Sequence, residues 1–268
     1  MPRLHAAPLF SAPDLQLYRV TCDGQDGPRL KEEAVDSNRL VLALHGRFQF
    51  RDPKTRAVVS PGVGLRLSPR RPCEISHPHG SGDACVSVRG DWLRRWDSSD
   101  ATTLPVGEDA YRKLHAVLTH ASAGAPVDRL QVEEALGLVL APPEPTSSGA
   151  SQRERDIAHA IAHEAALHFD AGTSVEDLAR GARVSAFHAC RVFRKVMGTG
   201  IHQFIQEVRL RHALALVLDT RRPLAEVALE AGFANQGHLG NAFRRRFGQS
   251  PGATRKAHAP SRFSAGAS

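Results

Sequence analysis

The chain has 268 residues, of which 41% are hydrophobic and 24% are charged, a composition typical of globular proteins that excludes a wholly disordered chain. Its apolar runs are far shorter than the roughly 18 residues of a membrane-spanning helix, and its first residues lack the apolar segment of a secretory signal. Its four scattered cysteines exclude a disulfide scaffold. The length predicts about two domains, and we expect a cytoplasmic protein with no membrane contact.

The net charge of +7 is concentrated in the second half of the chain. Residues 1–141 carry 18 Lys and Arg against 17 Asp and Glu, whereas residues 142–268 carry 17 against 11. Fifteen of those 17 basic residues are arginines, which form bidentate hydrogen bonds with phosphates and with guanine edges. DNA is therefore a candidate partner, although a coding bias toward arginine accounts for the excess equally well.

A proline-rich stretch divides the chain. Residues 142–152 contain three prolines followed by a Ser/Gly cluster, a composition that neither continues a helix nor packs in a core. We therefore expect a linker here, a first domain over 1–141, a second domain over 153–258 and a disordered tail at 259–268.

The first domain shows strand signals up to about residue 100. Alternating or short apolar runs occur, with turns between them, at 39–44, 46–51, 58–59, 63–67, 74–76 and 84–88. This spacing predicts a β-sandwich or small barrel. Helical periodicity follows at 108–123 and 129–140, and these helices either pack on the barrel or pair between subunits. The second helix is expected to place four residues on one side: Leu130, Leu136, Val139 and Leu140.

The second domain contains an internal repeat. Residues 178–195 and 227–245 each place a small alanine in a short helix, followed by a turn and a second helix. This order is typical of a helix-turn-helix unit, whose second helix presents its N-terminal side chains outward. The second helices are expected to begin after the N-caps Ser185 and Asn235 and to close on the buried residues Phe193 and Phe243.

Other local signals support helices throughout this domain. Gly232 suits a turn residue with positive φ, whereas Arg183 at the equivalent position of the first copy does not. A helix is expected over 153–169, and Ser174 with Asp177 predicts a capping box at the start of the next one. Residues 201–218 are expected to form one helix of about 27 Å that holds the two units about one DNA turn apart.

Three motifs of the second domain occur in the order and spacing of a known family. They are Arg-Leu-Arg-His-Ala at 209–213, the pairs Val227-Ala228 and Gly232-Phe233, and the segment 243–251 ending in Ser-Pro. Residues 153–257 thus resemble the DNA-binding domain of AraC/XylS-type transcriptional regulators, a family that includes activators. Ala189 and Thr254 depart from the family pattern, where a leucine and an aromatic residue are usual, and predict looser packing.

This resemblance implies that the exposed N-terminal half of each second helix contacts bases. The residues concerned are Phe187, His188, Cys190 and Arg191 in the first unit and Gln236, Gly237, His238 and Asn241 in the second. Arg191 suits guanine, Gln236 and Asn241 suit adenine, and Phe187 suits a thymine methyl group. Further along the helices, phosphate-contacting or solvated side chains are expected at Arg194, Lys195, Arg244, Arg245 and Arg246.

The first domain resembles, at Pro61-Gly62 and at 68–72, the cupin-like sensor domain that often precedes such a DNA-binding module. The resemblance implies a small effector bound by residues 15–100 and, by family habit, a dimer formed through 108–140. A metal-binding cupin enzyme needs a His-x-His pair and a glutamate in its first motif, and residues 46–50 contain neither. We therefore expect no enzymatic activity and no cofactor.

One further cluster comprises Cys73, His77, His79 and Cys85. Thiolate and imidazole ligands suit zinc or copper, although the spacing matches no recognised zinc finger. The cysteines are also explained as core residues and the histidines as part of a polar loop at the mouth of the barrel, beside an effector pocket. Both interpretations stay open at this point.

The sequence therefore predicts an α+β protein of two domains. The first is a cupin-like β-barrel or sandwich with trailing helices, and the second is an all-α double helix-turn-helix domain. The predicted function is sequence-specific regulation of transcription under the control of a small effector. Double-stranded promoter DNA is the expected partner, with RNA polymerase and a second copy of the chain as further candidates. The alternatives are a metal- or redox-responsive regulator and a cupin-type metalloenzyme with a basic accessory domain.

Overall fold

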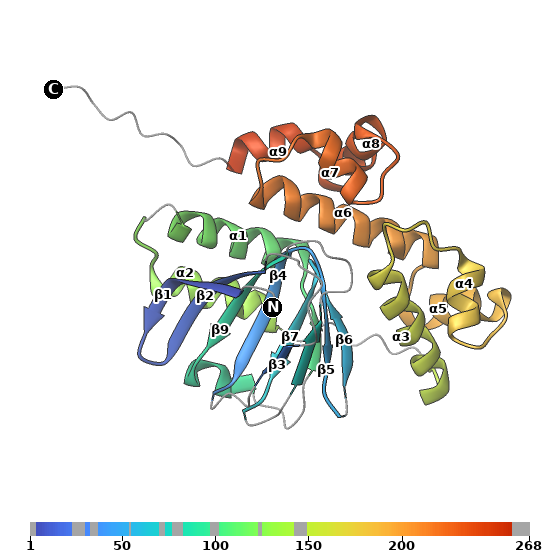
Figure 1. Cartoon of the computed structure of the whole chain (residues 1–268), viewed down its shortest axis with the longest axis horizontal. Helices are drawn as coiled ribbons and strands as arrows, with labels where there is room; N and C mark the ends of the chain where they lie inside the picture. The colour runs from blue at the N-terminus through green and yellow to red at the C-terminus, as the bar shows by residue number, and fades with distance from the viewer. Residues whose placement is uncertain are drawn as a thin grey trace.

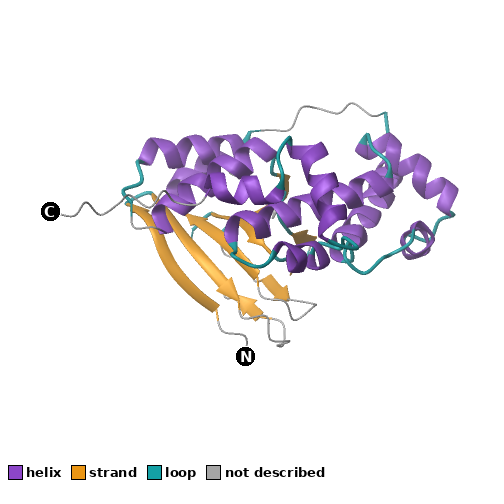
Figure 2. Cartoon of the chain, turned by 90° about the horizontal axis from the view of Figure 1, so that it is seen from above, coloured by secondary structure: helices purple, strands orange, loops and turns teal. Residues whose placement is uncertain are grey.

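The computed structural model describes residues 4–22, 30–32, 37–53, 55–69, 73–76, 83–96, 102–122, 125–141 and 149–258. Strands occupy the N-terminal part and helices the C-terminal part (Figure 1), which confirms the predicted two-part α+β organisation. Seen from above, the helices form a layer along one side of the strands (Figure 2). None of the helices in these ranges is long and apolar enough to cross a membrane.

The strands form two antiparallel sheets. The larger sheet has the order β1-β2-β9-β4-β7-β10 and the smaller one the order β3-β8-β5-β6. The strand bounds are β1 Leu4–Ala12, β2 Leu15–Cys22, β3 Leu30–Glu32, β4 Arg39–His45, β5 Phe48–Arg51, β6 Arg56–Val59, β7 Val63–Leu67, β8 Cys73–Ser76, β9 Asp83–Arg89 and β10 Thr102–Pro105.

Strand β4 is apolar at nearly every position because both of its faces are covered. Val41 and Ala43 point between the sheets, where they join Phe48 and Phe50 of β5 in one core. The alternate residues of β4 (Leu40, Leu42 and Leu44) belong to a second core beneath the helices. The strand therefore connects the interior of the two-sheet structure to the helical layer.

Four strands lie outside the runs predicted from the sequence: β1, β2, β3 and β10. β2 carries a usable signal, since Leu15 and Leu17 alternate with polar residues and are buried. β1 is an edge strand that pairs with β2 and has a bulge between Pro8 and Phe10. β10 ends shortly before the first α-helix and pairs with β7.

Helices α1 (Glu108–Ser122) and α2 (Arg129–Leu140) follow the strands and pack on the larger sheet. Leu136, Val139 and Leu140 are buried, as predicted. The prediction for Leu130 is wrong, because its side chain is 68% exposed. Val132 and Ala135 are buried instead, so the buried face of α2 begins at Val132.

The C-terminal part is helical from Gln152 onward. The first helix starts one residue before the predicted position, because Ser151 forms a capping box with Glu154. The helix bounds are α3 Gln152–Leu167, α4 Val175–Gly181, α5 Ala186–Met197, α6 Ile201–Asp219, α7 Leu224–Glu230, α8 Gln236–Phe247 and α9 Pro251–His258; a short 3-10 helix, η1 (Asp91–Trp96), lies in the N-terminal part.

Two cores divide the helical layer between them. The core of α3, α4 and α5 also receives Ile201 and Ile205 from the first half of α6. The second half of α6, from Leu210, joins a larger core that contains α7 and α8 together with α1, α2 and the six-stranded sheet. Helix α6 therefore belongs to both cores. In Figure 1 it runs from the group of α3, α4 and α5 to the group of α7, α8 and α9.

Candidate DNA-binding surface

The first helix-turn-helix unit consists of α4 and α5. Ser174 and Asp177 form the predicted capping box at the start of α4, and Ser185 caps α5 by accepting a hydrogen bond from the His188 N–H. Between the helices, the Val184 N–H donates to the Ala179 carbonyl over 3.0 Å. Because Ala179 has a small side chain, the two helices approach closely there.

The second unit, α7 and α8, repeats this local structure. Asn235 caps α8 by accepting a hydrogen bond from the His238 N–H, and the Phe233 N–H donates to the Ala228 carbonyl over 2.8 Å. Phe193 in the first unit and Phe243 in the second are both fully buried, as predicted. The internal repeat of the sequence is thus a repeat of structure.

One turn position in each unit adopts a left-handed backbone. Gly232 has φ 77°, as predicted, and Arg183 has φ 56° at the equivalent position of the first unit. A Cβ atom on residue 232 would lie 2.9 Å from Nε of Arg209 and 3.1 Å from the carbonyl of Phe169. Position 232 therefore requires glycine, because its backbone is left-handed and there is no space for a side chain. In the first unit, Arg183 adopts a left-handed backbone at a cost in free energy.

The residues predicted to contact DNA lie at the surface of α5 and α8. Phe187 is 80% exposed at the start of α5, which is unusual for a large aromatic side chain. The exposed members of the set are Phe187, Cys190, Arg191, Arg194, Lys195, Gln236, Gly237, His238, Asn241, Arg244 and Arg245, and His188 is half-buried. Neither helix has an acidic residue in its first turn, so both N-termini are open to an anion.

Some of these side chains already have partners on the protein. Lys195 Nζ lies 2.8 Å from Oε2 of Glu154 at the start of α3, and together with the Ser151 N–H it lowers the pKa of Glu154 to about 2. Arg191 Nη2 lies 3.3 Å from Nδ1 of His188, one helical turn away. Lys195 is thus neutralised by a carboxylate, while Arg191 is positioned by a neighbouring ring.

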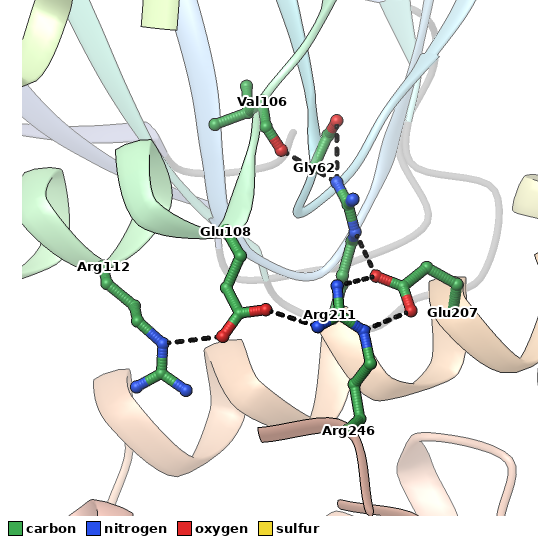
Figure 3. A network of polar contacts seen from close by, with 7 residues as sticks. All are labelled: Gly62, Val106, Glu108, Arg112, Glu207, Arg211 and Arg246. Carbon is green, nitrogen blue, oxygen red and sulfur yellow. Dashed lines mark hydrogen bonds and ion pairs between the residues drawn. The ribbon is translucent and has the colours of Figure 1, made fainter. Parts of the chain in front are cut away.

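Arg246 differs from the expectation of a phosphate-contacting or solvated side chain. Its guanidinium lies 2.8 Å from Glu207 on α6 and 2.7 Å from Glu108 on α1 (Figure 3). Glu207 also receives a hydrogen bond from Arg211, and although burial opposes ionisation, the two arginines hold the pKa of Glu207 below its usual value. Helix α8 is therefore tied to the N-terminal part through this network.

Arg211 completes the network on the side of the strands. Its Nη1 donates to the carbonyl of Val106 over 2.8 Å and lies 3.5 Å from that of Gly62 (Figure 3). A Cβ atom on residue 62 would lie 2.4 Å from this nitrogen, so glycine permits the close approach. Sequence reasoning missed this network, because helix spacing reveals only the i, i+4 pairs Glu207–Arg211 and Glu108–Arg112 and not the contacts that join them.

A second polar cluster lies at the C-terminal end of α6. The Asp219 side chain is 3% exposed and pairs with Arg19 of β2. His45 of β4 lies 3.1 Å from one oxygen of Asp219, and His115 of α1 lies 3.8 Å from the other. A buried carboxylate thus links α6 to three elements of the N-terminal part.

The turn between α3 and α4, which leads into the first unit, is held to the strands by Arg47. Its Nη2 lies 3.0 Å from Asp170, just beyond α3, and its guanidinium lies 4.6 Å from the centre of the Phe169 ring. The Arg47 side chain is 6% exposed. Charged contacts with the N-terminal part are therefore made by α8 of the second unit and by the turn that precedes the first unit.

The cluster of Cys73, His77, His79 and Cys85 is only partly described. Cys73 is buried between the sheets and Cys85 packs against the same core, in agreement with the interpretation as core residues. His77 and His79 lie outside the described residues. Among the residues that the structure does describe, no group of three or more His, Cys, Asp or Glu side chains is arranged to hold a metal ion.

Residues 178–257 match the family model of a helix-turn-helix domain, which spans both units. The HTH-type transcriptional regulator GlxA of Rhizobium meliloti is 42% identical over 79 residues, which cover 30% of this chain and 24% of the relative. The melibiose operon regulatory protein of Escherichia coli K12 is 31% identical over 91 residues, which cover 34% of this chain and 30% of the relative. The alignments thus cover less than a third of either relative. The solved structure of ToxT from Vibrio cholerae O395 is 9% identical with a TM-score of 0.39, over 93% of this chain and 100% of that chain.

Proposed function

On the premise that residues 178–257 form an AraC-type helix-turn-helix domain, we propose that the protein is a sequence-specific, DNA-binding regulator of transcription. The observation that carries the proposal is the pair of structurally equivalent units, each with an exposed and basic second helix. Helix α6 joins them, and its 19 residues span about 28 Å. This length suits two helices that enter successive major grooves about 34 Å apart.

We assign base contacts to the N-terminal halves of α5 and α8. Arg191 reads guanine with its planar guanidinium, and Gln236 and Asn241 read adenine. Phe187 packs on a thymine methyl group, since its exposed ring has no apolar cover on the protein surface. His188, Cys190 and His238 line the same faces, and Gly237 allows close approach without adding a contact of its own.

We assign phosphate contacts to Arg194, Arg244 and Arg245. Lys195 also contacts a phosphate once its ion pair with Glu154 has opened. Such contacts give affinity and salt dependence without sequence information. Arg246 is not part of this set, because Glu207 and Glu108 already hold it.

The N-terminal part is proposed as a cupin-like effector domain over residues 1–141. The linker expected at 142–152 is shortened at its end, because Ser151 caps α3 and Gln152 begins it. Support comes from two facing antiparallel sheets that enclose an apolar core. RNA polymerase and a second copy of the chain, pairing through α1 and α2, complete the proposed partners. Binding promoter DNA also calls for the cytoplasmic location expected from the sequence.

The test is selection of bound sequences from a random pool of double-stranded DNA by the full chain, at a fixed salt concentration. We expect one motif with two boxes about one helical turn apart. Arg191→Ala should relax the preference at one base pair of one box by about 1–3 kcal/mol, and Gln236→Ala should do so in the other box.

Arg245→Ala is the matched control for these variants. It removes a positive charge from the same surface, so it should weaken binding to all sequences alike and reduce the salt slope by about 1. A sequence preference that survives both Arg191→Ala and Gln236→Ala would refute the base-contact assignment. Recovery of only salt-sensitive, sequence-independent binding would refute the proposed function itself.

A further inference from the structure

The turn that joins α3 to α4 contacts several parts of the chain at once. Phe169 is 2% exposed, and its ring lies 5.0 Å from the ring of His212 on α6 and 4.6 Å from the guanidinium carbon of Arg47. The two carboxylate oxygens of Asp170 accept hydrogen bonds from Arg47 over 3.0 and 3.1 Å. The turn therefore links the first helix-turn-helix unit both to the strands and to the helix that joins the two units.

The turn of the second unit packs against this same turn. A Cβ atom on residue 232 would lie 3.0 Å from Cα of Asp170 and 3.1 Å from the carbonyl oxygen of Phe169. Gly232 belongs to the turn between α7 and α8, whereas Asp170 precedes α4. The two units therefore meet directly, in addition to being joined by α6, and the lack of a side chain at Gly232 leaves room for this contact.

Arg209 of α6 lies at the point where the two turns meet. Its Nε donates a hydrogen bond to the carbonyl of Phe169 over 2.7 Å, and the same nitrogen would lie 2.9 Å from a Cβ atom on residue 232. Burial lowers the pKa of Arg209 and the nearby Asp170 opposes this shift, and an arginine stays charged in a protein. A charged donor on α6 therefore binds the backbone of one turn while it packs against the backbone of the other.

The position of Arg209 along α6 gives this contact its importance. The core of the first unit includes Ile205, and the core that contains the second unit begins on α6 at Leu210. A helix held by separate cores at its two ends can bend between them, and bending changes the angle between the units. A further contact away from the helix axis restricts this freedom, because α6 and the two units then form a closed triangle.

The angle between the units determines which arrangement of DNA boxes they can read together. Since a turn of 10–10.5 base pairs spans about 34–36 Å, one additional base pair moves a box by about 3.4 Å along the duplex and rotates it by about 34°. Two units held at a fixed angle fit one separation of the boxes, whereas two units that can rotate fit more than one. The preferred separation therefore depends on what holds the units at their angle.

We propose that Arg209 is a positioning residue that fixes the angle between the two units and thereby sets the spacing between the two DNA boxes. It does so by binding the Phe169 carbonyl where the first unit meets Gly232 of the second. This role differs from the base contacts assigned to α5 and α8, because it concerns the relative orientation of those helices. The effect on DNA rests on the proposed function, whereas the effect on the angle does not.

The first test measures the relative position of the units without DNA. Spin labels on the exposed Cys190 of α5 and at Asn241→Cys of α8 report the distance between the two helices by electron paramagnetic resonance of the full chain. Cys85→Ser removes the partly buried thiol, and the remaining two cysteines are buried. We expect one narrow distance distribution in this labelled parent and a broader or shifted one when Arg209→Gln is added. Identical distributions would overturn the proposal.

The second test measures the spacing on DNA. Equilibrium binding compares the selected duplex with a duplex that has one additional base pair between the boxes. The parent chain should bind the longer duplex about tenfold more weakly, because one box then loses its base contacts. Arg209→Gln should bring the two affinities closer together by about threefold or more, with the base preferences inside each box unchanged. An unchanged ratio of affinities in Arg209→Gln would overturn the proposal.

Two further variants separate this role from a general loss of stability. Phe169→Leu removes the ring that packs on His212 and Arg47 but keeps the carbonyl that Arg209 binds, so it should lower the thermal midpoint without changing the ratio. Arg94→Gln, at an exposed arginine on η1, should change neither. The ratio does not depend on the fraction of folded protein, so destabilisation alone leaves it unchanged. An equal change of the ratio in Phe169→Leu would show that packing of the turn sets the spacing and would overturn the proposal.

The two tests also distinguish this inference from the proposed function. A changed distance distribution without sequence-specific binding by the parent chain would refute the proposed function, and with it the effect on DNA, while confirming that Arg209 fixes the angle between the units. Sequence-specific binding by the parent chain, with an unchanged ratio in Arg209→Gln, would refute this inference and leave the proposed function standing.

Discussion

We expect replacement of His212 by leucine to make the fold more resistant to mild acid. The His212 side chain is 4% exposed on α6, and its ring lies 5.0 Å from that of Phe169. Burial lowers the pKa of His212 to about 3, and the positive charge of Arg47 adds to the shift. Nδ1 of His212 makes no hydrogen bond to any residue that the structure describes. Leucine therefore removes the titrating group without breaking a hydrogen bond of that atom.

The size of the effect follows from proton linkage. Because the folded-state pKa of His212 lies below its ordinary value of 6.5, the unfolded chain takes up the proton first as the pH falls. The stabilisation is therefore complete above about pH 6.5 and is lost as the pH falls toward about 3, at about 1.4 kcal/mol per pH unit. Between about pH 7.5 and pH 5, His212 should lower the free energy of unfolding by about 2 kcal/mol.

The assay is urea unfolding followed by circular dichroism at both pH values. The parent chain should lose about 2 kcal/mol more than His212→Leu on going to the lower pH. His159→Leu, which replaces an exposed histidine on α3, should lose as much as the parent chain. An equal loss in the parent chain and in His212→Leu would show that His212 is not a buried neutral histidine in the folded protein.

Three further predictions concern stability, each measured by thermal or urea unfolding. Asp219→Ala should lower the free energy of unfolding by about 3–5 kcal/mol, because it leaves Arg19 without its buried partner. Glu134→Ala, at an exposed ion pair, should lower it by less than about 1 kcal/mol. Equal losses in the two variants would contradict the burial argument. Gly232→Ala should cost about 1–3 kcal/mol and Arg183→Gly should gain up to about 1 kcal/mol, and the same sign for both would contradict the left-handed turns. Phe193→Ala should cost about 3–5 kcal/mol, and a cost below 1 kcal/mol would contradict its place in the core.

The C-terminal helices could be predicted well because their signals are local. These signals are a serine or asparagine N-cap, a glycine at a left-handed turn and a phenylalanine on the buried face of the helix. Each of them depends on only a few neighbouring residues. In the structure, the predicted N-caps Ser185 and Asn235 cap their helices, and Gly232 has the predicted positive φ. The repeat strengthened this inference, since the same signals occur at equivalent positions of both copies.

The contacts between the two parts of the chain could not be predicted, because they join residues far apart in the sequence. Arg19 and Asp219 are separated by 200 positions, and Arg246 and Glu108 by 138. Nothing in the local pattern distinguishes such residues from solvated charges. One signal was available: β4 is apolar on both faces, which requires a second layer of structure over the sheet.

The division of the cores determines which helix-turn-helix unit is easier to displace. The second unit shares one large apolar core with the six-stranded sheet, so separating it from the N-terminal part exposes much apolar surface. The first unit has a core of its own, and α3 meets the sheet through a small apolar cluster formed by Val58, Ala166 and Leu167. Since α6 passes from one core to the other between Ile205 and Leu210, displacement of the first unit must bend or shift α6 in this stretch. The first unit therefore depends for its attachment on this small cluster and on the ion pair of Arg47 with Asp170, and it is the unit that is easier to displace.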